Sequence, residues 1–404
     1  MGIEMEVERE YTICMLYANY MKNKQRITRT IRTLAITVML QVFCACIFFT
    51  AVAAEDRFPN VSAQSAVVLD CSSERLLYEK NSDKRMKIAS TTKIMTAILI
   101  LENCDLDEIV EITTEHYAEG SSMYLREGEK VSVRDLLYGL MLMSGNDAAL
   151  ALAYHCSGGP DSFADLMNVK ASEIGMTNSS FRNPNGLDTE GHYSTAKDMA
   201  ILASYCMKND DFRKIVGTKG GSFAGRYMTN NNKLLHRLEG CTGLKTGYTK
   251  SAGRCLVSSV SRDGRETVVV TLNAPNDWND HTLLHNRAFD AYDKQVVGLS
   301  GMACTDIPVQ NGKSPRVKLN YSEDCIVWIA DGEKVETKIY ADRFVYAPVR
   351  AGEYAGEMRI YINESETCRV PLVFSADIDE VVKETGLFAR FIRHLKDVVS
   401  GSPF

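Results

Sequence analysis

Residues 65–98, with the sequence SAVVLDCSSERLLYEKNSDKRMKIASTTKIMTAI, contain the pattern from which the fold can be inferred. Two short apolar runs, Ser65–Asp70 and residues 75–79, flank the segment Cys71-Ser72-Ser73 and predict a β-hairpin. Apolar residues at helical spacing follow Ser90 and predict a helix that begins near this serine. This part of the chain is therefore expected to form two strands followed by a helix.

Further helices are expected after this one. Ser132 and Asp135 resemble a capping box at the start of the apolar run LLYGLMLM. Other helical segments, separated by glycine and proline turns, cover residues 146–156, 161–174 and 195–207. Strands follow at residues 256–261 and 267–273, joined by the turn Arg262-Asp263-Gly264, and then a helix at 280–296. This order predicts an α+β domain, an antiparallel sheet covered by helices with an all-helical insert.

Beyond about residue 303 short strands alternate with turns. The expected strands cover residues 316–320, 325–329, 337–340, 358–362 and 369–374. They predict a small all-β domain. The expected organisation is a leader at 1–54, a first domain at 55–302, the β domain at 303–378 and a tail at 379–404.

The tail is expected to contain an amphipathic helix. One face is apolar and consists of Leu387, Phe388, Phe391, Ile392, Leu395, Val398 and Val399. The opposite face is largely basic. Such a helix at a terminus is typical of an anchor on a membrane surface. The alternative is a helix that packs on its own domain.

The leader has the features of a secretory signal peptide. A basic run at residues 22–32 precedes an apolar segment at 34–54, which ends in Ala51-Val52-Ala53-Ala54. The alternative is a permanent membrane-spanning helix, since this segment could nearly cross a bilayer. Residues 1–20 carry four glutamates that do not suit a signal peptide, so we expect translation to start at Met21. The sequence therefore predicts a protein that is exported across a membrane.

Composition narrows the class of protein. The 404 residues are 45% hydrophobic and 24% charged with a formal net charge of -6, which is typical of a globular protein and argues against nucleic acid as the main partner. Of 12 cysteines, nine lie beyond the leader, and no Cys-x-x-Cys is present. An odd number without that spacing does not indicate a disulfide framework or a zinc ribbon, and most of these cysteines are expected to be small buried residues.

The first chemical motif is Ser90-Thr91-Thr92-Lys93. Residues three apart share one face of a helix, so the Lys93 amine can reach the Ser90 hydroxyl. A serine nucleophile needs an adjacent base, and lysine can act as a base only when burial or a nearby cation lowers its pKa. The backbone N–H of Ser90, at a helix start, could also stabilise an oxyanion.

Two further motifs follow. Ser144-Gly145-Asn146 lies after Ser90, and Lys245-Thr246-Gly247 opens the later strand region. Lys245 and Thr246 can bind a carboxylate, Gly247 permits close approach of a ligand, and the N–H of Tyr248 can be a second oxyanion donor.

Each motif also has a simpler structural explanation. The first recurs at Ser194-Thr195-Ala196-Lys197, where Thr195 and Asp198 are better interpreted as a helix cap. Residues 144–146 could be a turn between helices, and residues 245–247 a strand end. Only the copy at Ser90 has the other two motifs after it in order. That order is the combination found in penicillin-binding proteins and class A β-lactamases.

Residues 61–300 resemble the low-molecular-mass penicillin-binding proteins that act as D-Ala-D-Ala carboxypeptidases. Besides the three motifs, matching segments are Gly120-Ser121-Ser122-Met123, Leu137-Tyr138-Gly139-Leu140-Met141, Asn183-Pro184-Asn185-Gly186-Leu187, His192-Tyr193-Ser194-Thr195-Ala196 and Ala252-Gly253-Arg254. The β domain and the tail resemble the family's C-terminal parts more loosely. The resemblance implies a β-lactamase-like (DD-peptidase) fold. Tyr248 stands where some relatives have histidine, so substrate preference or deacylation rate could differ.

The resemblance also implies roles for individual residues. These are Ser90 as nucleophile, Lys93 as base, Ser144 and Asn146 as proton relay and substrate contact, and Lys245, Thr246 and Gly247 as binding residues for the substrate carboxylate. The implied reaction removes the terminal D-Ala of a peptidoglycan stem pentapeptide through an ester on Ser90, and β-lactam antibiotics would acylate the same serine. No cofactor or metal is expected, because the histidine pair His281 and His285 lacks the glutamate of a His-Glu-x-x-His motif.

Two other functions compete with this one. A class A-like β-lactamase would need a carboxylate between the second and third motifs, and neither Glu173 nor Glu190 has the expected setting. A non-enzymatic peptidoglycan-binding protein would tolerate loss of Ser90 or Lys93, yet both are present.

Overall fold

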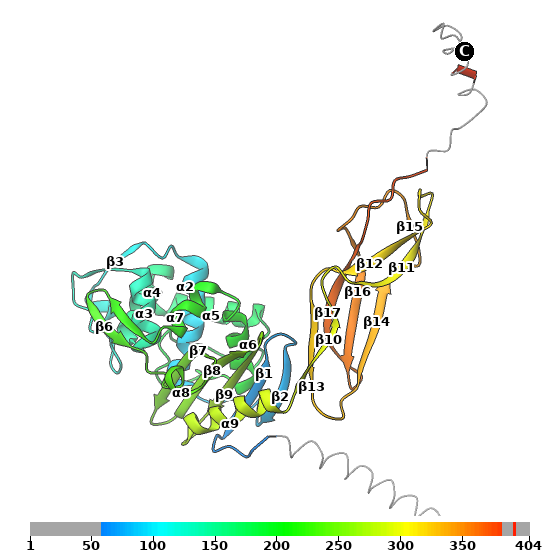
Figure 1. The fold of residues 1–404 in the computed structure, drawn as a ribbon. Coiled ribbons are helices and arrows are strands. Elements are labelled where there is room, and N and C mark those ends of the chain that lie inside the picture. Colours follow the sequence, from blue (N-terminus) through cyan, green and yellow to red (C-terminus); the bar gives the residue numbers. More distant parts are fainter. Residues whose placement is uncertain (1–57, 382–390, 393–404) are drawn as a thin grey trace, which may run out of the picture. The chain divides into compact units, whose positions relative to one another are not determined.

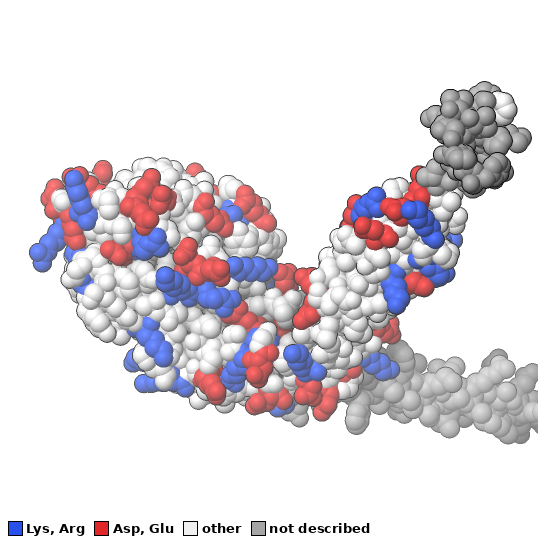
Figure 2. Space-filling view, turned by 45° about the horizontal axis from the view of Figure 1, so that its top comes forward, with Lys and Arg blue, Asp and Glu red and all other residues white. Residues whose placement is uncertain are grey.

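The computed structural model describes residues 58–381 and 391–392 (Figure 1). The expected signal peptide and most of the expected amphipathic tail therefore lie outside the described residues. Within the described part of the chain, no helix is long and apolar enough to span a membrane. Both signs of charge are interspersed on the face shown in Figure 2.

The first domain is built on a five-stranded antiparallel sheet. Its order is β2 (Arg75–Lys80), β1 (Ser65–Asp70), β9 (Arg265–Leu272), β8 (Gly253–Arg262) and β7 (Cys241–Thr249). β1 pairs with β9, which lies about 200 residues later in the sequence, with Val67 opposite Val270 and Val68 opposite Val269. These four valines are fully buried, so the register is specified by the apolar core. The predicted hairpin and the later strand pair thus form a single sheet.

Helices cover this sheet and form an insert between β2 and β7 (Figure 1). They are η1 (Ala89–Thr92), α2 (Lys93–Asn103), α3 (Val133–Leu142), α4 (Asn146–Ser157), α5 (Pro160–Glu173), α6 (Ala196–Cys206), α7 (Asp210–Gly217), α8 (Leu234–Arg237) and α9 (Asp277–Asp290). Two short hairpins, β3 (Ile109–Glu111) with β4 (Lys130–Ser132) and β5 (Gly220–Phe223) with β6 (Arg226–Thr229), and η2 (Thr114–His116) complete the domain. The predicted α+β architecture is confirmed.

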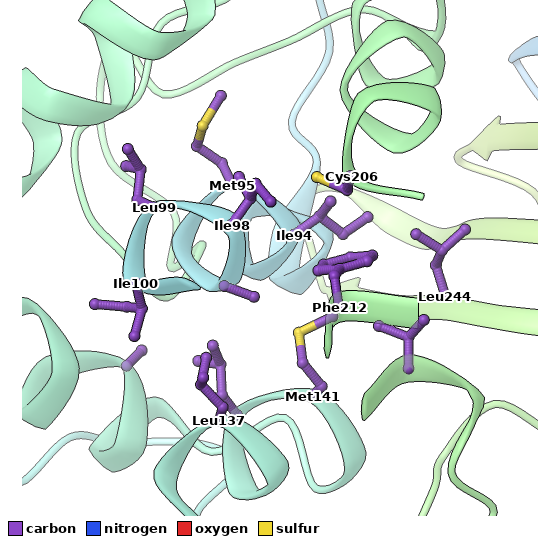
Figure 3. Packing of buried hydrophobic residues seen from close by; sticks show 14 of the residues in the cluster. Ile94, Met95, Ile98, Leu99, Ile100, Leu137, Met141, Cys206, Phe212 and Leu244 are labelled. Carbon is purple, nitrogen blue, oxygen red and sulfur yellow. The ribbon is translucent and has the colours of Figure 1, made fainter. Parts of the chain in front are cut away.

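Helix α2 lies at the centre of the core. Its first eight residues, Lys93 to Ile100, are all buried, which is typical of a helix that is surrounded on every side. Ile94, Ile98 and Ile100 point outward in different directions and contact side chains of α3, α6, α7 and β7 (Figure 3). Burial of each such side chain contributes roughly 2 kcal/mol. The residue at the start of α2 is consequently held in a rigid position.

Several features of the first domain differ from the prediction. The last helix ends at Asp290 instead of residue 296, and β10 (Asp293–Gly298) follows and pairs with β13 (Cys325–Ile329). The valines at 296 and 297 continue the apolar spacing of the helix, but they are β-branched and their strand partner lies 30 residues away. Helix α7 and hairpin β5–β6 were also not predicted.

The C-terminal part is all β, as predicted. A six-stranded sheet has the order β14 (Val335–Ala341), β16 (Tyr354–Ile362), β17 (Ser365–Phe374), β12 (Arg316–Tyr321), β11 (Ala303–Gln310) and β15 (Val345–Tyr346). Its apolar core includes Leu319, Val327, Ile360 and Leu372, and is separate from the core around α2. Strands β11 and β15 were not predicted. Because β10 pairs with β13, we place the domain boundary near residue 292 instead of 303.

The histidine pair on α9 belongs to a buried hydrogen-bond network. His281 contacts the hydroxyls of Ser258 (2.6 Å) and Thr271 (2.9 Å), and His285 contacts those of Ser258 (2.8 Å) and Thr267 (2.9 Å). All four ring nitrogens are therefore engaged by hydroxyl groups. Burial lowers the pKa of His281 to about 3 and that of His285 well below its usual value, since the neighbouring His281 and Arg262 add to the desolvation. Both imidazoles are neutral in the folded protein.

We expect the protein to lose stability as the pH falls from 7 to 5.5. Below about pH 6.5 the unfolded chain binds protons at His281 and His285 that the folded protein does not bind, so the free energy of unfolding decreases by up to ~1.4 kcal/mol per pH unit and histidine. Burial lowers the pKa of His192 to about 4, which adds to the effect. Urea unfolding at the two pH values measures this loss. His236 is exposed, so His236→Gln should leave the slope unchanged, and a pH-independent stability would contradict the prediction.

Candidate active site

The first two sequence motifs meet at Lys93. Its Nζ atom lies 3.0 Å from Ser90 Oγ, 2.7 Å from Asn146 Oδ1 and 2.6 Å from the backbone oxygen of Asn185. Ser90 belongs to η1, which continues into α2, so serine and lysine are one helical turn apart as the spacing predicts. Asn146 begins α4, and its Nδ2 donates to the Glu119 carbonyl (2.6 Å). The geometry joins a serine hydroxyl, an amine and an oriented amide.

The surroundings of Lys93 favour a neutral amine. The side chain is fully buried, and desolvation, followed by the nearby Lys245 cation, holds its pKa well below the usual value of a lysine. The Asp147 carboxylate opposes this shift more weakly. Lys245 is also buried, and desolvation lowers its pKa to about 7. Neither lysine forms a salt bridge with a described acidic residue, so an incoming anion would stabilise a positive charge on Lys245.

The third motif lies against the nucleophile. A Cβ atom on Gly247 of β7 would come within 3.0 Å of the backbone nitrogens of both Ser90 and Thr91. Only glycine allows the strand to come this close. Thr246 is half-buried, and Tyr248, the next residue along β7, is exposed. This contact brings the third motif on β7 next to the backbone of η1 at Ser90.

The second motif has an unusual backbone. Ser144 has a φ of +63°, in the left-handed region, and its side chain is buried. The Ser144 hydroxyl makes no hydrogen bond to another described residue, so its role as a proton relay stays a prediction. Strained backbone of this kind costs on the order of 1–3 kcal/mol and is found preferentially at functional sites. The glycine at 145 is required as well, since a Cβ there would lie 2.8 Å from Asp147 Oδ1.

Asp147 is a residue of the site that the motifs did not indicate. Its carboxylate accepts hydrogen bonds from Ser122 Oγ (2.6 Å) and from the backbone N–H groups of Met123 (3.0 Å) and Leu125 (3.1 Å). This carboxylate fixes the segment from Ser122 to Leu125. The carbonyl of Glu119, just before this segment, orients Asn146. Its position directly after the second motif was the signal that could have identified it.

The loop at residues 183–188 forms another wall of the site. Besides the Asn185 contact with Lys93, the carbonyl of Pro184 accepts a hydrogen bond from Thr96 Oγ1 (2.6 Å). Asn183 Oδ1 accepts from the N–H of Gly186 (2.7 Å) and closes the turn. The loop therefore holds the lysine through a backbone carbonyl.

Gly186→Ala is expected to displace this loop. Gly186 has a φ of +83°, and a Cβ would lie 2.0 Å from the backbone oxygen of Ala89. We expect a loss of roughly 1–3 kcal/mol in stability and at least a tenfold slower acylation of Ser90, measured with a fluorescent penicillin. Gly158→Ala is the matched control, because Gly158 has a φ of +82° but no atom within 4 Å of its Cβ. Equal acylation rates in the two variants would contradict the expected displacement.

The two carboxylates weighed for a β-lactamase do not contact the Ser90–Lys93 pair. Glu173 ends α5 and pairs with Lys170 at 3.0 Å, and Glu190 is exposed on the loop before His192. His192, two residues further along, contacts the hydroxyl of Thr92 (2.9 Å). This loop therefore packs on η1, which carries Ser90, through an imidazole that burial keeps neutral.

An α+β fold that presents a serine beside a buried lysine, with a third motif on the adjacent edge strand, defines a serine enzyme that acts by acyl transfer. The comparisons with known proteins agree. Residues 50–276 match the D-alanyl-D-alanine carboxypeptidase family (peptidase S11), and residues 292–380 match the C-terminal domain of penicillin-binding protein 5. The chain belongs to the S11 family of serine-type D-Ala-D-Ala carboxypeptidases.

The similarity to known proteins extends over most of the chain. It is 33% identical to D-alanyl-D-alanine carboxypeptidase DacF of Bacillus subtilis, over 82% of this chain and 89% of that protein. It is 31% identical to DacC of Escherichia coli, over 84% and 90%. The structure of penicillin binding protein 5 from Haemophilus influenzae matches with a TM-score of 0.67 and 28% identity, over 80% of this chain and 99% of the other. The predicted family, fold and carboxypeptidase activity are thereby confirmed.

Proposed function

We propose that the enzyme removes the terminal D-Ala from peptidoglycan stem pentapeptides through an acyl-enzyme on Ser90. The observation that carries this assignment is the buried Lys93 amine, 3.0 Å from Ser90 Oγ and close to a second buried cation. A serine next to a neutral amine is an activated nucleophile. Membership of the carboxypeptidase family supplies the substrate class.

In the first step Ser90 Oγ attacks the carbonyl carbon between the two terminal D-Ala residues, and Lys93 Nζ takes the hydroxyl proton. The developing oxyanion is stabilised by the backbone N–H groups of Ser90 and Tyr248. Lys93 passes this proton through Ser144 to the leaving amine, and free D-Ala departs. Water then attacks the ester while Lys93 takes a proton from it. Lys93 returns that proton to Ser90 Oγ as the shortened peptide leaves, which restores the serine hydroxyl and the neutral amine.

Lys245 and Thr246 bind the terminal carboxylate of the substrate. The buried Lys245 has no salt bridge to a described acidic residue, so a carboxylate that enters the site supplies its counter-charge. Bound carboxylate raises the pKa of Lys245 and keeps that lysine charged, which in turn favours the neutral form of Lys93. β-Lactam antibiotics carry a carboxylate and a reactive carbonyl, and they acylate Ser90 by the same route.

A cavity of about 760 Å³ provides room for the rest of the peptide. It is lined by Met143, which directly precedes Ser144, and by residues of the loop after Gly120 and of hairpin β5–β6. Its position beside the second motif suits the part of the stem peptide on the N-terminal side of the cleaved bond.

Mass spectrometry of the wild type and of Ser90→Ala tests this function. After incubation with benzylpenicillin we expect a penicilloyl adduct on the wild type and none on the variant. Incubation with a peptide that ends in D-Ala-D-Ala should release one D-Ala from the wild type alone. Rapid penicillin turnover without D-Ala release would indicate a β-lactamase, and neither adduct nor release from folded protein would leave a binding role.

The enzyme belongs to a family of exported penicillin-binding proteins that act on the cell wall. We propose that the leader at residues 1–54 directs export and that the tail at 379–404 associates with the outer surface of the cell membrane. The apolar face and the opposite, largely basic face expected for the tail support this association. Loss of membrane association after truncation at residue 381, measured by cell fractionation, is the expected result.

A further inference from the structure

Two of the helices that carry active-site residues have a cysteine at or next to their C-terminal end. Helix α2 begins at Lys93 and is followed directly by Cys104, whose N–H caps the helix at the Ile100 carbonyl (3.0 Å). Helix α4 begins at Asn146 and has Cys156 in its last turn. Cys104 lies 11 residues after Lys93, and Cys156 lies 10 residues after Asn146, which correspond to rises of about 16 and 15 Å.

The starts of these helices are joined by the contact of 2.7 Å between Lys93 Nζ and Asn146 Oδ1. Helices α2 and α4 also pack on each other along their length, and each has its cysteine at the C-terminal end. The thiols of Cys104 and Cys156 hydrogen-bond to each other there, at the edge of the main apolar core.

The β domain contains a second pair of cysteines whose thiols contact each other. Strands β12 and β17 are antiparallel, with Leu319 opposite Phe374 and Tyr321 opposite Leu372. The turn after β12 keeps this register, since the N–H of Ser322 donates to the carbonyl of Pro371 (3.1 Å). Cys325 begins β13 three residues after Ser322, and Cys368 lies on β17 three residues before Pro371. Their thiols hydrogen-bond to each other.

In each pair the two thiols contact each other directly, as cysteines that form a disulfide must. The family acts outside the cytoplasm, where disulfides form and persist. The structure has all nine described cysteines as free thiols.

We propose that Cys104 with Cys156 and Cys325 with Cys368 form two disulfide bonds in the exported protein. In each pair one thiolate attacks the sulfur of an external disulfide, R–S–S–R, and releases one R–SH. The second cysteine attacks the mixed disulfide and releases the other R–SH, so the protein loses two electrons and two protons to the oxidant. The hydrogen bond within each pair assists the first step, because it lowers the pKa of Cys156 to about 7 and that of Cys368 below its usual value.

The first bond would fix α2 and α4, which carry the catalytic centre, to each other at both ends. The Lys93–Asn146 contact joins α2 and α4 at one end, and the disulfide would join them at the other. The second bond would join β13 of the two-stranded sheet to β17 of the six-stranded sheet. Each disulfide thus connects elements that are not neighbours in sequence.

The remaining five described cysteines are expected to stay reduced. Three of them donate to backbone carbonyls, namely Cys241 (3.5 Å to Gly243), Cys255 (3.8 Å to Lys87) and Cys304 (3.4 Å to Leu319). Cys206 is fully buried in the core, and Cys71 is half-buried beside it. They supply internal controls for any measurement of thiol state.

Peptide mapping tests the proposal. The full chain, exported by a bacterial host, is equilibrated with a glutathione buffer rich in the oxidised form, denatured and alkylated without reduction. We expect Cys104–Cys156 and Cys325–Cys368 cross-linked peptides and alkylation of the five remaining described cysteines. Nine alkylated cysteines, mixed disulfides with glutathione at these four positions, or other pairings would overturn the proposal.

Variants separate the bonds from general effects on folding. Cys156→Ser should free only Cys104 for alkylation, and Cys368→Ser should free only Cys325. A reductant should lower the melting temperature of the wild type but not that of the variant with all four cysteines replaced by serine. If that variant does not fold, the two single variants still decide by their alkylation patterns. Cys304→Ser is the matched control and should leave both cross-links intact.

Discussion

Lys93→Met is expected to slow the acylation of Ser90 by benzylpenicillin by at least ~10³-fold, measured as the rate of adduct formation. Methionine fills a similar volume but cannot accept the Ser90 proton, and general-base catalysis contributes typically 10²–10⁴-fold. The loss should not come from unfolding, because an apolar side chain replaces an amine at a fully buried position. Thermal unfolding of the variant checks this point.

Two controls accompany the lysine variant. Lys197 occupies the same place in the second Ser-x-x-Lys copy, where Thr195 Oγ1 accepts the N–H of Asp198 (3.0 Å) as a helix cap, so Lys197→Met should acylate normally. In the wild type the free amine is the reactive form, so the rate should rise with pH, with a midpoint well below 10.5. A Lys93→Met variant with undiminished acylation would remove lysine from the mechanism.

Asp70→Asn is expected to cost about 3–5 kcal/mol of stability, measured by urea unfolding. Arg265 is completely buried, and its Nε donates to Asp70 Oδ2 (2.6 Å) while Nη1 donates to the Ala288 carbonyl (2.6 Å). Removal of the carboxylate charge leaves a buried guanidinium without a counter-charge, which is strongly destabilising. The aromatic rings of Phe289 and Tyr292 near Arg265 compensate only in part.

A surface pair of the same residue types is the control. Asp306 and Arg316 also form a short ion pair (2.7 Å), but both side chains are about half exposed. Asp306→Asn should therefore leave the unfolding midpoint nearly unchanged, since water screens the charges. Equal losses in the two variants would show that burial does not determine the strength of the Asp70–Arg265 pair.

Local signals in the sequence predicted most helices of the first domain. The caps at Ser132 and Thr195 are bonds to residues three positions ahead, at 3.1 and 3.0 Å, so a short window contains all the information. The three motifs indicated Ser90, Lys93 and Asn146 for the same reason, and the structure brings them together.

The features that sequence reasoning missed depend on distant partners. Strand β10 exists because β13 pairs with it, and residues 291–296 alone continue a helical pattern. The contact between Lys93 and Asn185 uses a backbone carbonyl, which any residue type carries, so only the turn pattern around Gly186 marked that loop. The Cys104–Cys156 contact depends on the packing of α2 on α4, and it cannot be inferred from the spacing of the cysteines in the sequence.

The lone positive charge of Lys245, buried with no acidic partner among the described residues, places stability and antibiotic susceptibility in opposition. An apolar residue at this position would relieve the desolvation of the ammonium and should yield a more heat-resistant protein. On the role proposed for Lys245, the same change would weaken the binding of both peptide and drug. The reactivity of the site and its susceptibility to β-lactams therefore come with a cost in the stability of the fold.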